Sequence, residues 1–95
     1  MTTLESRINI PQDVLFRDVD GEAVILNLAT GKYFGLDQVG TRMWALLAQH
    51  KCVADCYRVL LDEYDVTAEQ LQHDLLNLID NLVSHQLIQI DETQT

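Results

Sequence analysis

Apolar and polar residues alternate over residues 13–36 with the two-residue period of β-strands. The alternation predicts strands at residues 14–19, 22–28 and 32–36. Asp20 and Gly21 suit a tight turn between the first two strands, because both residues tolerate positive φ angles. Gly31 suits a left-handed position before the third strand. We therefore expect a three-stranded antiparallel meander.

After Asp37 the apolar spacing changes to the helical period. Asp37 is a good N-cap for a first helix, and a second helix is predicted at residues 53–64. A third begins at Thr67, which can form a capping box with Gln70, and runs to about residue 85. A short alternating run at residues 87–90 predicts a terminal strand. The chain is expected to be an α+β domain at residues 13–91, between a flexible arm at 1–12 and a polar tail at 92–95.

The third predicted helix carries more apolar surface than a helix packed on one side needs. A narrow leucine stripe is enough to hold it to a core, yet a second apolar stripe lies beside the first. Two interpretations stay open: both stripes belong to the core, or the second is partly open as the wall of a groove for a bound peptide. The first stripe comprises Leu71, Leu75, Leu78 and Leu82, and the second comprises Leu76, Ile79 and Val83.

The strand at residues 32–36 would be an edge strand if the meander keeps its sequence order. Such edges are usually blocked by proline, charges or a cover, but this one has no proline, one charge and a glycine. An extended peptide can add to such an edge as a further strand. The alternative is that the N-terminal arm or another strand covers it. Alternation places Lys32, Phe34 and Leu36 on one face of the strand and Tyr33 and Gly35 on the other.

The charge balance is strongly acidic, with a formal net charge of −9 from 15 acids and 6 bases, and no Lys or Arg follows Arg58. DNA binding depends on Lys and Arg contacts to phosphates, so the pattern excludes nucleic acid as a favoured partner. No apolar run approaches the roughly 18 residues of a membrane span. The polar N-terminus is not a secretory signal. These features predict a cytoplasmic protein without a membrane partner.

Candidate chemistry is sparse. Cys52 and Cys56, with His50 before them, raise a metal or redox alternative, but zinc needs a second ligand pair and redox motifs are CxxC rather than CxxxC. Apolar helix packing of Cys56 is the favoured interpretation. His73 and His85 have no partner by spacing and are expected at the surface. No nucleophile–base pair or phosphate loop is visible, so we predict no catalytic residue, no metal, no cofactor and no enzymatic activity.

Two segments, DGEAVILNLATGKYFGLDQVGTRMWALL and EYDVTAEQLQHDLLNLIDNLVSHQLI, resemble the PqqD-like family across about residues 14–90. These proteins are the recognition elements of ribosomal peptide natural-product pathways. The resemblance implies a winged helix-turn-helix, in which a three-stranded antiparallel sheet is followed by three helices. It also implies a non-catalytic, chaperone-like protein that captures a precursor's leader peptide and presents it to a separate leader peptidase or modifying enzyme.

The motif GKYFGLD fits the lasso-peptide versions of the family better than those of pyrroloquinoline quinone synthesis. An accessory role in quinone synthesis stays open, as does an acidic winged-helix regulator or protein-interaction module. The sequence departs from the family at Cys52, where a Thr or Ser cap is common, and at Cys56, where an aliphatic residue is usual. The resemblance implies a leader cleft lined by Lys32, Tyr33, Phe34 and Gly35 on the third strand and by Gln72, Leu75, Leu76, Ile79 and Val83 on the third helix.

Overall fold

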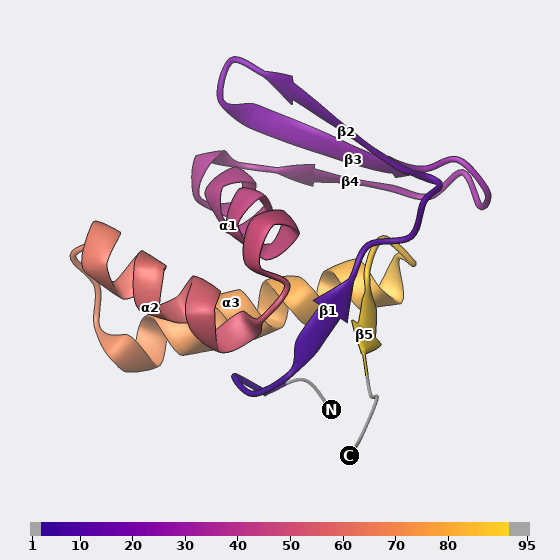
Figure 1. Ribbon diagram of the computed structural model, residues 1–95. Coiled ribbons are helices and arrows are strands. Elements are labelled where there is room, and N and C mark those ends of the chain that lie inside the picture. The colour runs from indigo at the N-terminus through magenta and orange to yellow at the C-terminus, as the bar shows by residue number, and fades with distance from the viewer. Residues whose placement is uncertain (1–2, 92–95) are drawn as a thin grey trace.

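Two antiparallel sheets and three helices make up the computed structural model, which describes residues 3–91 (Figure 1). The α+β class is confirmed, with three strands followed by three helices and a small additional sheet. The elements are β1 (Arg7–Asn9), β2 (Val14–Val19), β3 (Glu22–Asn27), β4 (Tyr33–Leu36), α1 (Gln38–His50), α2 (Val53–Glu63), α3 (Ala68–Ser84) and β5 (Gln89–Asp91).

The three-stranded sheet has the predicted order β2-β3-β4. Its first turn is the predicted tight hairpin, because Asp20 and Gly21 both have positive φ angles (55° and 84°) between the paired residues Val19 and Glu22. One face packs on the helices and buries alternate side chains, among them Ile25. The opposite, outer face leaves apolar side chains exposed. These are Leu15, Val19, Val24, Leu28 and Tyr33.

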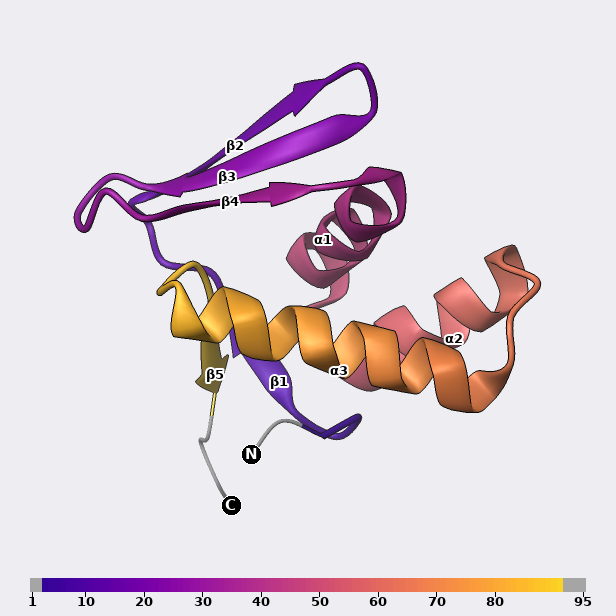
Figure 2. The ribbon, with the colours of Figure 1, turned by 180° about the vertical axis from the view of Figure 1, so that it is seen from behind.

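Below the sheet, α1 lies against β3 and β4, and α2 and α3 form a further layer beneath α1 (Figure 1, Figure 2). Asp37 caps α1 as predicted, since its carboxylate accepts a hydrogen bond from the Gly40 amide at 2.8 Å. Thr67 likewise accepts from the Gln70 amide at 3.2 Å. The second half of the predicted capping box does not form, because the Gln70 side chain donates to Asp74 instead, at 2.9 Å.

An ion pair joins α1 to the end of α2. Arg42 donates through Nε to one carboxylate oxygen of Glu63 at 2.9 Å and through a terminal nitrogen to the other. The Arg42 guanidinium holds the pKa of the Glu63 carboxyl below its usual range. Both side chains are substantially exposed, so this pair contributes little to the free energy of unfolding.

The N-terminal arm is more ordered than its sequence predicts. Residues 7–9 form β1, which pairs with β5 in the register Ile8 with Ile90. Ile8 is buried, and its amide donates to the Lys51 carbonyl in the α1–α2 connection at 2.8 Å. The expectation of a flexible arm is therefore wrong for these residues. The terminal strand begins at Gln89 rather than at residue 87, and the predicted tail at 92–95 lies outside the described residues.

Cys56 packs in the core, as the favoured interpretation of the cysteine pair predicts. Burial raises the pKa of its thiol to about 11. Cys52 is the N-cap of α2 and makes no side-chain capping bond. Within residues 3–91 no group of His, Cys, Asp or Glu side chains is placed to hold a metal ion. None of the helices described above is long and apolar enough to cross a membrane.

The cysteine environments predict selective alkylation. At pH 8 we expect iodoacetamide to modify Cys52 and to leave Cys56 unmodified. A thiol with a pKa of about 11 has only about one thiolate in a thousand at that pH. Mass spectrometry of the native protein should show a single adduct, and the protein unfolded in urea should show two. Rapid modification of Cys56 in the folded protein would contradict its burial.

Candidate functional site

The outer side of β4 is an open edge. The order β2-β3-β4 leaves one long side of β4 without a strand partner among residues 3–91. The N-terminal arm does not cover this edge, because β1 pairs with β5 instead. Gly35 lies on this strand, and a Cβ built on it meets no atom within 4 Å. Because no strand of residues 3–91 pairs with it, this edge is free to pair with another extended chain.

The pairing of β4 with β3 determines which backbone groups face the open side. The Asn27 amide donates to the Lys32 carbonyl at 2.9 Å. Because hydrogen-bonded and non-hydrogen-bonded pairs alternate along an antiparallel ladder, Phe34 faces β3. The N–H and C=O groups of Tyr33 and Gly35 therefore point away from the sheet. These four groups are the donors and acceptors that a guest strand would use.

A hollow of about 690 Å³ lies between β4 and the C-terminal end of α3. Two of its lining residues, Phe34 and His85, meet edge to face with their ring centroids 5.1 Å apart. The structure brings all four predicted strand residues to this hollow. Its lining residues are Gly31, Lys32, Tyr33, Phe34, Gly35, Ser84 and His85.

A second hollow, of about 360 Å³, lies nearer the middle of α3 and is also lined by the start of α1. The helix residues that line the two hollows recur every three or four positions, so they share one side of α3. We call this side the groove face of α3. It consists of Asp74, Asn77, Leu78, Asn81, Ser84 and His85.

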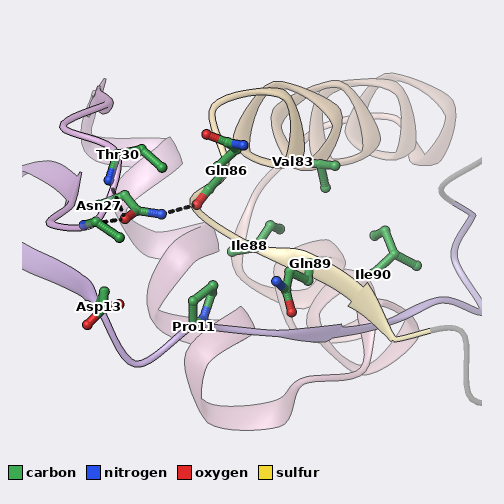
Figure 3. A pocket seen from close by; sticks show the side chains of 10 residues that line it. Pro11, Asp13, Asn27, Thr30, Val83, Gln86, Ile88, Gln89 and Ile90 are labelled. Atoms are coloured by element: carbon green, nitrogen blue, oxygen red, sulfur yellow. Dashed lines mark hydrogen bonds between the residues drawn. The ribbon is translucent and has the colours of Figure 1, made fainter.

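The helix residues implied by the resemblance lie elsewhere. Leu75 and Ile79 are fully buried in the core, so the expectation that Ile79 is partly open is wrong. Gln72 and Leu76 line a different hollow, on another side of α3. Val83 turns toward β5, where it lines a pocket of about 620 Å³ (Figure 3). At about 100° per residue, the side of α3 that carries Leu76 and Val83 is roughly opposite the groove face.

Sequence reasoning missed the polar members of the site. His85, expected as a surface residue without a partner, is half-buried, and its Nδ1 lies 2.8 Å from the Asn81 carbonyl. The signal available in the sequence was its spacing, since His85 stands seven positions after Leu78 and four after Asn81. That spacing places the three residues on one side of the helix, but it does not say that this side meets β4.

The charged side chains of the two hollows have opposite signs. Lys32 lines the hollow at the end of α3, while Asp37 and Asp74 line the hollow beside α1. The groove face of α3 contains no Lys or Arg. It can accept an extended chain with mixed polar and apolar side chains, but it offers nothing to a phosphate backbone.

Comparison with known proteins finds a matching family model and similar solved structures. A family model described as coenzyme PQQ synthesis protein D (PqqD) matches residues 22–88. Among solved structures, that of TbiB1 in complex with the TbiA(beta) leader peptide is 32% identical, with a TM-score of 0.77 over 90% of this chain and 98% of that chain. Lasso peptide synthetase B1 complexed with the leader peptide is 19% identical, with a TM-score of 0.66 over 87% and 98%, and supports the fold alone. No curated protein matches this chain.

Proposed function

We propose, from the premise that the chain belongs to the PqqD family, that it is a non-catalytic protein that captures the leader segment of a ribosomally made precursor peptide. The leader adds to β4 as a further antiparallel or parallel strand. The open edge of β4 beside the groove face of α3 is the observation that supports this proposal most directly. The likeness to TbiB1, whose structure contains a leader peptide, adds to it.

The backbone of β4 supplies affinity, and the side chains of the groove supply selectivity. The guest would bond to the outward N–H and C=O groups of Tyr33 and Gly35, each bond contributing about 1 kcal/mol net. Its alternate side chains would point between β4 and α3, onto the edge-to-face pair of Phe34 and His85. Of the residues implied by the resemblance, Lys32, Tyr33, Phe34 and Gly35 fit this role. We assign the helix side to the groove face in place of Gln72, Leu75, Leu76, Ile79 and Val83.

The captured leader would be presented to a separate leader peptidase or modifying enzyme. Holding the leader raises the effective concentration of the rest of the precursor at that enzyme. We favour a lasso-peptide pathway, because of the GKYFGLD motif and the 32% identity to TbiB1. The alternative is an accessory role in pyrroloquinoline quinone synthesis, which the description of the matching family model favours.

Fluorescence polarisation tests the proposal. Two labelled peptides would be titrated with the protein: the TbiA(beta) leader peptide and the N-terminal segment of a short precursor encoded beside the gene of this chain. We expect saturable binding to at least one peptide and none to a scrambled peptide of the same composition. Absence of saturable binding to both leader peptides would overturn the proposal.

Filling the groove should block the leader. We expect Ser84→Trp to lower the affinity for the peptide at least about tenfold, which corresponds to about 1.4 kcal/mol, because the indole would occupy the hollow beside β4. Gln72→Trp is the matched control, since Gln72 is also an exposed residue of α3 but lines a different hollow. The same loss in both variants would argue against binding on the groove face.

A further inference from the structure

Asn27, the last residue of β3, is a buried polar residue, with only 6% of its surface exposed. Both polar atoms of its side-chain amide are hydrogen-bonded. The oxygen accepts from the amides of Ala29 and Thr30, at 2.8 and 3.2 Å, and the nitrogen donates to the Gln86 carbonyl at 2.6 Å (Figure 3). One side chain thus contacts two segments that are far apart in the sequence.

The first segment is the turn that starts β4. Besides the two bonds to the Asn27 side chain, the Gly31 amide donates to the Asn27 carbonyl at 2.8 Å, and Gly31 takes a φ angle of 78°. The chain from Asn27 to Lys32 is therefore wrapped around the Asn27 amide. This arrangement fixes where Lys32 and Tyr33, the first residues at the open edge, lie.

The second segment is the turn that ends α3. Gln86 has a φ angle of 61°, and its amide donates to the Val83 carbonyl at 3.0 Å, while the next amide, of Leu87, reaches back to Leu82 at 2.9 Å. These bonds hold the Gln86 carbonyl in place. Ser84 and His85, on the α3 side of the hollow, directly precede this residue.

The Asn27–Gln86 bond therefore links the turn before β4 to the turn after α3. These two elements are the walls of the hollow. We propose that Asn27 is a positioning residue for leader binding: its amide sets the distance between the start of β4 and the end of α3, and so the width of the groove. This inference rests on the proposed leader-binding function. Asn27 itself touches no guest, because it is buried behind the turn.

An isosteric substitution separates the two contacts. Asn27→Asp keeps the oxygen that accepts from Ala29 and Thr30, so the turn retains its bonds, but it replaces the donor that faces the Gln86 carbonyl with an oxygen. We expect the affinity for the labelled leader peptide to fall at least about tenfold, the scale of one lost buried hydrogen bond. The ring contact between Phe34 and His85, measured as an NMR cross-relaxation signal, should weaken at the same time.

A matched control separates positioning from general stability. Val53→Ala removes buried volume at the start of α2, remote from the hollow, and should lower the urea midpoint while affinity and the Phe34–His85 signal stay at their wild-type values. Asn27→Ser, which keeps an acceptor for the turn but is too short to reach Gln86, repeats the test with a neutral side chain. Circular dichroism confirms that each variant is folded at the titration temperature.

Each outcome is decisive. Weakened binding and a weakened ring signal in folded Asn27 variants, with both intact in Val53→Ala, support the inference. Wild-type affinity in folded Asn27→Asp or Asn27→Ser overturns it, as does failure of both variants to fold, because Asn27 would then serve the fold as a whole. Absence of binding by the wild-type protein would instead reject the proposed function.

Discussion

Tyr33→Pro is expected to lower the affinity for the leader peptide at least about a hundredfold, because proline removes an N–H that a guest strand needs and places its ring on the open edge. The substituted amide points away from β3, so no bond of the existing sheet is lost. Fluorescence polarisation with the labelled leader peptide measures the change, and circular dichroism confirms the fold.

Tyr33→Ala is the control for this substitution. The Tyr33 ring lies on the outer face of the sheet and is 68% exposed, so its removal keeps the backbone donor and takes from the hollow only the part of the lining that this side chain provides. We expect a much smaller change in affinity than in Tyr33→Pro. Wild-type affinity in a folded Tyr33→Pro variant would be incompatible with strand addition at β4.

Ile79→Asp is expected to unfold the protein. Ile79 is fully buried on α3, and an unpaired carboxylate there costs several kcal/mol, a large part of the roughly 5–15 kcal/mol by which a domain of this kind is stable. Circular dichroism and a urea titration measure the loss. Leu76→Asp is the control, because Leu76 is only half-buried on the same helix and should tolerate the change.

This pair of variants also tests which side of α3 holds the guest. The apolar pattern of the sequence left open whether Ile79 and Leu76 belong to the core or to a groove wall, and the family resemblance implied the groove wall. The structure places Ile79 in the core and Leu76 away from β4. If Ile79→Asp remains folded and loses leader binding, the sequence-based assignment would be the better one.

The local features of the fold were predictable because their causes lie within a few residues. Asp20 and Gly21 make the hairpin, and Asp37 and Thr67 cap helices, through interactions that span three residues or fewer. The pairing of β1 with β5 was not predictable in this way. Residues 7–9 are a short run with a single buried side chain, Ile8, and their partner strand stands at the other end of the chain.

The strand wall of the candidate site was predictable from neighbouring residues, whereas the helix wall was not. The strand wall follows from alternation and from the absence of blocking residues around Gly35. The helix wall depends on how α3 is rotated, and an apolar pattern indicates which side is buried rather than which side meets a guest. The side of α3 that faces the core is centred on Leu75 and Ile79, between the two predicted apolar stripes. The groove therefore lies on the partly polar side of the helix, which contains Asn81.

The pairing of β1 with β5 places the two ends of the described chain next to each other, with Arg7 opposite Asp91. This corner lies away from the three-stranded sheet that contains β4 (Figure 1). A longer polypeptide can therefore enter and leave the domain at one anchored point without crossing the open edge.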